Sequence, residues 1–141
     1  MQKEKVRDTA QISPKTAKSS PARSRAGTQA KVASELKRLQ GITKDAIPDG
    51  QRATAMPILA NLAFQKVKLD EARAALMDEG IFTSYDNGGG QSGMREHPGF
   101  AAYNKLFATF SRGVKQITDM MPGESAASDA LTAFLAETRD A

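Results

Sequence analysis

The stretch "PGFAAYNKLFATFSRGVKQITDMMPG", residues 98–123, decides the fold class of this 141-residue chain. Its large apolar side chains recur at alternating steps of four and three residues, at Tyr103, Phe107, Phe110, Val114, Ile117 and Met121. That spacing predicts a helix with an apolar seam sustained over nearly three heptads. Pro98 suits the first helical position with His97 as its cap, and Pro122 stops the helix. Gly113 lies beside the seam, where it would allow a neighbouring helix to approach closely.

A second long helix is predicted upstream, from about Arg52 to Glu79. We expect its regular part to begin close to Pro57, because a missing N–H is tolerated in the first turn, and Gly80 to end it. One face carries a broad apolar stripe, interrupted by Gln65 and made of Ile58, Leu62, Leu69, Ala72 and Leu76, widened by Leu59, Ala63 and Val67. A stripe this broad needs cover from more than one neighbour.

The two helices are separated by "GIFTSYDNGGGQSGMREHPGF", residues 80–100. The Asp86-Asn87-Gly88 sequence suits a tight turn, and the residues before it suit a short strand. Glycine amides can cradle an anion, but a phosphate-binding loop needs a Lys followed by Ser or Thr, which this one lacks. We therefore favour a rigid, partly hairpin-like connector. The alternative is a nucleotide-binding enzyme that uses Gly88–Gly90.

Other catalytic arrangements have little support in the sequence. The chain has one histidine and no cysteine, which excludes disulfides and thiolate sites. Ser92, His97 and Asp86 could be combined into a triad, but no oxyanion feature accompanies them. Asp78, Glu79 and Asp86 could attract a divalent cation, although two of these acids suit the solvated end of a helix. We expect no enzyme, no cofactor and no bound metal.

The expected fold is all-α, with an antiparallel helical hairpin over residues 51–123, flanking short helices, and an amphipathic helix within residues 124–141. A hairpin alone leaves half of each stripe exposed, which favours association of copies into a ring-type oligomer. The oligomer core would be Leu62, Leu69, Leu76, Tyr103, Phe107, Phe110, Val114 and Ile117. The alternative is a monomer in which the C-terminal helix folds back to complete a bundle. That helix carries Leu131, Phe134 and Leu135 on one side, for docking onto a partner or for packing within the oligomer.

Charge is distributed unevenly along the chain. Residues 1–45 hold 11 Lys/Arg against 4 Asp/Glu, whereas the rest hold 9 against 12. Residues 1–27 are predicted to be a disordered basic tail, because they have too little apolar surface to offset backbone ordering. Residues 28–50 are predicted to be a short helical segment, with one helix that Thr28 caps and Gly41 ends or, over residues 28–47, two short helices of the helix-turn-helix kind.

A polyanion would meet this basic segment first. The expected partner is double-stranded DNA, held through its phosphates by Lys15, Lys18, Arg23, Arg25, Lys31, Lys37 and Arg38. No run approaches the roughly 20 apolar residues that span a bilayer, and the N-terminus lacks a signal-peptide core. A cytoplasmic location is expected.

Between the long helices, "SYDNGGGQSGMREHPGFAAYNKL" (84–106) follows "LDEARAALMDEG" (69–80). This combination resembles the small subunits of phage terminases over roughly residues 55–123. The family's Tyr-Asn-Gly-Gly loop and its Pro-initiated helix match at Gly80, Tyr85, Asn87, Gly88, Gly89, Gln91, Gly93, Pro98, Tyr103 and Leu106.

The resemblance implies a non-catalytic subunit of a genome-packaging motor that acts in the host bacterial cytoplasm. Such subunits form rings, engage viral DNA and deliver it to the large terminase subunit, which holds the ATPase and the nuclease. Many members carry a well-formed N-terminal helix-turn-helix. The short basic segment of this chain departs from that pattern.

Overall fold

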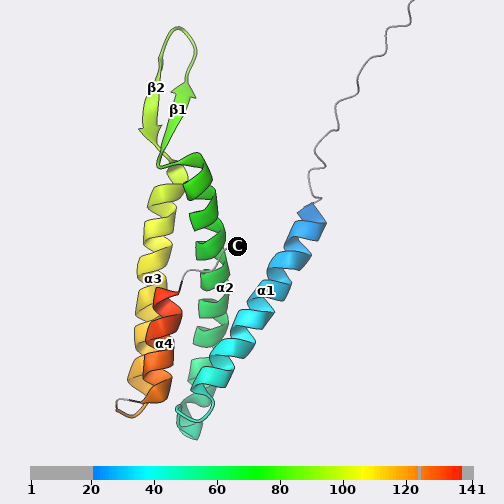
Figure 1. Cartoon of the computed structure of the whole chain (residues 1–141), viewed down its shortest axis with the longest axis vertical. Coiled ribbons are helices and arrows are strands. Elements are labelled where there is room, and N and C mark those ends of the chain that lie inside the picture. Colours follow the sequence, from blue (N-terminus) through cyan, green and yellow to red (C-terminus); the bar gives the residue numbers. More distant parts are fainter. Residues whose placement is uncertain (1–20, 124, 138–141) are drawn as a thin grey trace, which may run out of the picture.

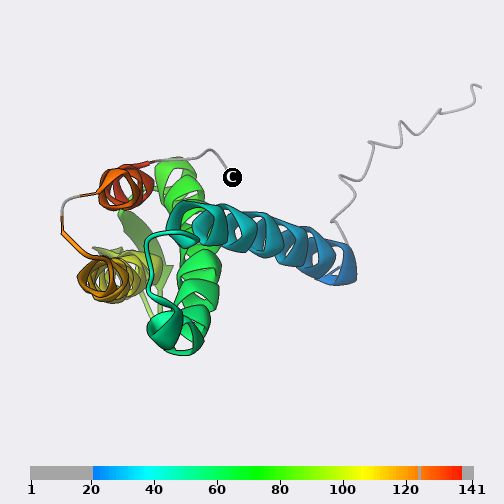
Figure 2. The ribbon, with the colours of Figure 1, turned by 90° about the horizontal axis from the view of Figure 1, so that it is seen from below.

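The computed structural model describes residues 21–123 and 125–137, with side chains from Ser24 onward. In chain order the elements are α1 (Pro21–Thr43), α2 (Asp49–Glu79), β1 (Phe82–Asp86), β2 (Ser92–Glu96), α3 (Pro98–Met120) and α4 (Ala126–Ala136). α2 and α3 run side by side, and the β-hairpin projects from one end of the pair (Figure 1). α4 folds back over the other end, where α1 also joins the bundle (Figures 1 and 2). The predicted helical hairpin is confirmed, and its connector is a two-stranded antiparallel sheet.

The helices turn back on each other through contacts that the sequence indicated. Gly80 ends α2 with a φ of 78°, a conformation that favours glycine, and its N–H donates to Leu76 O at 2.8 Å. His97 caps α3 as predicted, because its Nδ1 accepts a hydrogen bond from Gly99 N at 2.9 Å. With Nδ1 accepting, Nε2 carries the proton and donates to Glu79 Oε2 at 2.6 Å. His97 therefore ties the end of α2 to the start of α3.

Further along the pair, Gly113 lets α2 and α3 approach closely, as predicted. A Cβ atom at this position would lie 2.8 Å from Leu62 Cδ2, which is closer than real Cβ contacts. Any larger residue would force the two helices apart or displace a buried leucine.

The core lies at the end of the pair that is remote from the β-hairpin. All four helices contribute to it, and its largest fully buried side chains are Leu39, Leu62, Phe110, Ile117, Leu131 and Phe134. The rings of Phe110 and Phe134 lie 6.0 Å apart, which joins α3 to α4. Ser125 caps α4 by accepting from Ser128 N at 3.2 Å. The C-terminal helix therefore folds back onto the hairpin of its own chain, the placement that the alternative expected for this helix.

The predicted limits of the first helix are wrong at both ends. α1 begins at Pro21, so residues 21–27 are helical, while residues 1–20 lie outside the described part of the chain. Thr28 is not a cap, and α1 continues through Gly41 to Thr43. Burial explains the extension: Thr43 is covered, and its Oγ1 donates to Leu39 O at 2.9 Å. This packing offsets the roughly 1 kcal/mol cost of a helical glycine. One long helix therefore replaces the two short helices of the helix-turn-helix alternative.

The start predicted for α2 is also wrong. The helix begins at Asp49, and Pro57 lies in its interior. Arg52 fixes the first turn, since its guanidinium donates to Lys44 O at 3.0 Å and to Ile47 O at 3.5 Å. Ala55 and Leu59 are buried on either side of the proline, and this packing opposes the break that a proline favours.

Burial changes the roles expected of two residue sets. Five of the eight predicted oligomer-core residues are covered within one chain: Leu62, Leu69, Phe110, Val114 and Ile117. In the predicted docking set, Leu131 and Phe134 are fully buried, and Leu135 packs partly buried against the same core. These side chains stabilise the folded chain, so neither a second copy nor a partner can reach the buried ones. Leu76, Tyr103 and Phe107 keep exposed surface.

Candidate nucleic-acid interface on the first helix

α1 is the most basic element that the structure describes. It carries five Lys/Arg and one Glu. The N-terminal end of α1 lies apart from the α2–α3 pair (Figures 1 and 2). Arg25, Lys31 and Lys37 are exposed. They are six residues apart, so successive side chains are rotated by about 240° around the helix. The positive charge therefore surrounds α1 instead of forming one stripe, an arrangement suited to phosphates more than to reading base edges.

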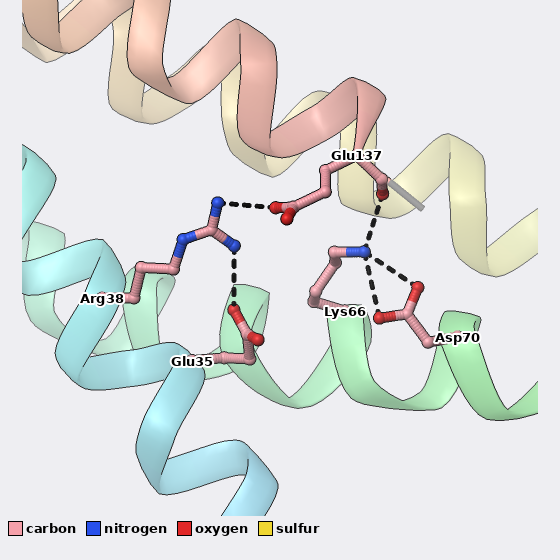
Figure 3. Close-up of polar contacts among 5 residues, drawn as sticks. All are labelled: Glu35, Arg38, Lys66, Asp70 and Glu137. Atoms are coloured by element: carbon pink, nitrogen blue, oxygen red, sulfur yellow. Dashed lines mark hydrogen bonds and ion pairs between the residues drawn. The ribbon is translucent and has the colours of Figure 1, made fainter. Parts of the chain in front are cut away.

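Arg38, also predicted to bind DNA, does not belong to this exposed set, because its side chain is partly covered and paired with acids. Its guanidinium pairs with Glu35 Oε2 at 3.5 Å and with the Glu137 carboxylate. It also lies 5.1 Å from the centre of the Phe134 ring. Arg38 thus joins α1 to the end of α4 (Figure 3).

The predicted DNA-binding residues Lys15 and Lys18 lie outside the described residues, as does the side chain of Arg23. Arg25, Lys31 and Lys37 are consequently the predicted DNA-binding side chains that the structure shows exposed on α1.

A buried lysine that the sequence pattern did not predict also holds the end of α4. Lys66 is only 3% exposed, and its Nζ donates to both Asp70 oxygens at 2.8 and 3.0 Å and to Glu137 O at 2.9 Å. Figure 3 shows Lys66 and Arg38 on either side of Glu137. The i,i+4 spacing of Lys66 and Asp70 could have suggested the pair, but not its burial.

Glu71 of α2 anchors α1 through a contact with Thr28. Thr28 Oγ1 donates to Glu71 Oε1 at 3.1 Å, and Lys68 Nζ donates to Oε2 at 2.8 Å. Burial raises the pKa of Glu71, but the hydrogen bonds from Lys68 and Thr28 and the charges of Lys68 and Lys31 outweigh it and leave the pKa below its ordinary value. The basic helix is therefore fixed by a carboxylate whose ionised form these contacts favour.

A groove of about 700 Å³ lies between the N-terminal half of α1 and α2. Val32 and Leu36 line it from α1, and the ring of Phe64 lines it from α2 with 47% of its surface exposed. Arg25 and Lys68 also line this groove, so its apolar walls are accompanied by positive charge. We call it the α1–α2 groove.

A second groove, of about 480 Å³, lies between α2 and α3 toward the β-hairpin. Its apolar walls are formed by Leu76, Met77, Phe100, Tyr103 and Phe107. α4 reaches only one end of this groove, where Lys66 and Glu137 lie.

The glycine loop is organised by a carboxylate. Gly88, Gly89 and Gly90 have φ values of 78°, 62° and 80°, which explains the three glycines. The Gly88 N–H donates to Asp86 Oδ1 at 2.8 Å, which places a negative charge beside the amides that a phosphate would need. The loop is closed by hydrogen bonds from Asn87 N to Gln91 O and from Gln91 N to Gly88 O. Its geometry is that of a turn between two strands.

The structure does not bring the candidate triad together. Asp86 and Ser92 are paired at the turn end of the hairpin, whereas His97 follows β2 at the opposite end and contacts Glu79. Across residues 21–123 and 125–137, no group of three or more His, Cys, Asp or Glu side chains is placed to hold a metal ion. Within the same ranges, no helix is both long and apolar enough to cross a membrane.

No protein-family model, curated protein or solved structure matches this chain. The resemblance to terminase small subunits therefore depends on the residues of the connector and its flanking helices alone.

Proposed function

We propose that this protein is a non-catalytic DNA-binding subunit of the terminase small-subunit type. In this proposal it assembles as a homo-oligomer, binds double-stranded viral DNA and delivers it to a large terminase subunit in the host cytoplasm. The observation that carries the proposal is α1, whose exposed Arg25, Lys31 and Lys37 stand on a helix that leans away from the bundle. The resemblance of the connector supports the assignment to genome packaging.

Charge distribution supports binding through α1 and not through the bundle. From Lys44 to the end, the chain holds ten Lys/Arg and thirteen Asp/Glu, so this part repels a polyanion. Contacts of lysine and arginine with phosphates release counterions, which makes the affinity independent of sequence and strongly dependent on salt. Delivery to the large subunit needs a further surface, and the buried face of α4 does not provide it.

The proposal is tested by titrating a labelled short duplex with the full chain and following fluorescence anisotropy over a range of salt concentrations. The triple variant Arg25→Gln/Lys31→Gln/Lys37→Gln is expected to bind more weakly. Its log–log salt slope should be shallower by about 0.9 for each phosphate contact removed. The matched control is Lys105→Gln/Arg112→Gln/Lys115→Gln, which removes three cations from α3 and should retain most of the affinity.

Equal losses in the two variants would show that only net charge matters, and would contradict an interface on α1. If the wild-type chain does not retain DNA at physiological salt, the DNA-binding function is wrong. The alternative, a structural helical assembly protein with an incidental basic segment, would then be favoured.

A further inference from the structure

An exposed apolar patch surrounds the junction of α2 with the β-hairpin. Met77, Phe82 and Met94 are 79%, 60% and 66% exposed, and Ile81 is also exposed. Phe82 and Met94 are on the same face of the hairpin, because Phe82 pairs with Glu96 and Met94 pairs with Ser84. We call these four residues the tip patch. A two-stranded hairpin is marginal in water by itself, so this apolar surface is a candidate for burial by another molecule.

The charge around the tip patch is negative. Residues 77–97 hold four acids and one arginine, the acids being Asp78, Glu79, Asp86 and Glu96. All four acids are exposed. An apolar surface with this border suits a partner surface that is apolar and basic.

The α1–α2 groove has those properties. Its apolar walls include Val32, Leu36 and the half-exposed Phe64, and Arg25 and Lys68 line the same groove. Lys31 lies close enough to the adjoining Glu71 to lower the pKa of that carboxyl, so it adds positive charge nearby. The groove and the tip patch are thus complementary in both polarity and sign of charge.

The tip patch and the α1–α2 groove of one chain cannot contact each other. Phe64 and Met77 belong to the same helix and are thirteen residues apart, which is about 20 Å along the axis. The same separation turns them about 140° away from each other around the helix. A contact between the two surfaces therefore requires two copies.

We infer that the tip patch of one copy docks into the α1–α2 groove of a second copy. The contact joins two different surfaces, so a pair of copies keeps one free groove and one free tip, and the association continues until the chain of copies closes. This inference rests on the homo-oligomer in the proposed function, but not on DNA binding.

The first test removes apolar surface without changing charge. In sedimentation velocity over a wide concentration range, the full wild-type chain is expected to associate. Phe64→Gln in the groove and Met77→Gln in the tip patch should each weaken association about tenfold or more. The matched control is Met56→Gln, because Met56 is an exposed apolar residue of α2 that lines neither surface. Circular dichroism verifies that each variant keeps its helices.

The second test exchanges charges between the two surfaces. Arg25→Glu should weaken association by making the groove repel the acidic tip. Asp78→Lys/Glu96→Lys should do the same from the tip side. Mixing the two variants should restore association, because the reversed groove then meets a reversed tip while the unaltered surfaces meet each other. If a variant lost association because it was unfolded, mixing it with the other variant would not restore association.

A wild-type chain that stays monomeric at all concentrations would overturn the inference. So would unaltered association in both Phe64→Gln and Met77→Gln, or a mixture of the charge variants that fails to associate. DNA binding is measured separately, on a short duplex and at concentrations where the chain is monomeric. Phe64→Gln and Met77→Gln keep every charge of α1 and should retain this binding, so failure of docking and failure of DNA binding are distinguished.

Discussion

The two halves of the α2–α3 pair differ in how far other helices bury them, although the same apolar pattern runs through both. In the half remote from the β-hairpin, Phe110, Val114 and Ile117 are buried in the core to which all four helices contribute. In the half next to the hairpin, Tyr103 continues the same seam and is only partly buried, and Phe107 is 42% exposed. The second half forms an open groove, whereas the first is the core.

The difference comes from the length and position of α4. This helix ends at Ala136, and Glu137 is held by Arg38 and Lys66 at the boundary between the two halves. Beyond that boundary, within the described residues, no helix of the chain covers the groove. A uniform apolar seam therefore contributes stability at one end and accessible surface at the other.

The largest expected effect compares two phenylalanines from the two halves. Phe134→Ala should lower the free energy of unfolding by about 3–5 kcal/mol, because the fully buried ring packs on Phe110 and leaves a cavity. Phe107→Ala should cost about 1 kcal/mol, because much of that ring already contacts water. Urea denaturation of both variants measures the difference. Equal losses of unfolding free energy in the two variants would show that Phe107 is as well buried as Phe134. That result would contradict the difference between the two halves.

The next effect concerns the boundary between the halves. Lys66→Met should cost about 3 kcal/mol, because it leaves Asp70 and Glu137 O without their buried partner. Lys115→Met is the matched control, since Lys115 and Asp119 form an i,i+4 pair that is exposed, and its loss should cost below about 1 kcal/mol. Thermal or urea unfolding compares the two. A cost for Lys66→Met as small as that for Lys115→Met would mean that α4 is not held by this contact.

The smallest effect depends on pH and concerns the anchor between α1 and α2. The pKa of Glu71 is lowered in the folded chain, so its contribution to stability is complete above the ordinary carboxyl pKa of 4.5 and is lost as the pH falls through the lowered value. Glu71→Gln should therefore flatten the decrease in unfolding free energy below about pH 4.5. Thr28→Ala should flatten it less, because Lys68 still donates to the carboxylate. Urea unfolding at a series of pH values checks both variants, and an unchanged acid dependence in Glu71→Gln would contradict the anchor.

Local signals account for the parts of the fold that the sequence predicted well. The seam and Pro98 predicted α3, Gly80 predicted the end of α2, and the glycine run predicted the turn. Each depends on interactions within a few residues, which a linear pattern contains. The predicted C-terminal end of α1 was wrong because the helix continues through Gly41 to a buried Thr43, and Leu39 in its last turns packs in the core that distant elements form.

The sequence likewise predicted only part of the candidate interface. The sequence identified the basic character of α1, but it could not separate the exposed Lys37 from the neighbouring Arg38, which turns toward α4. The buried pair of Lys66 and Asp70 was also missed, since an i,i+4 pair has the same letters on an exposed face and in a core.

From the sequence alone, the helical hairpin, its capped turn and the concentration of positive charge near the N-terminus were determined, because backbone sterics, apolar periodicity and charge are local properties. Only the tertiary structure decided which half of the seam is core, which of two adjacent cations is exposed, and that Leu131 and Phe134 belong to the chain's own interior. The reason is that burial depends on where distant elements come to lie. Here the decisive element is α4, which ends at Ala136, so that among the described residues no helix covers the other half of the continuous apolar surface.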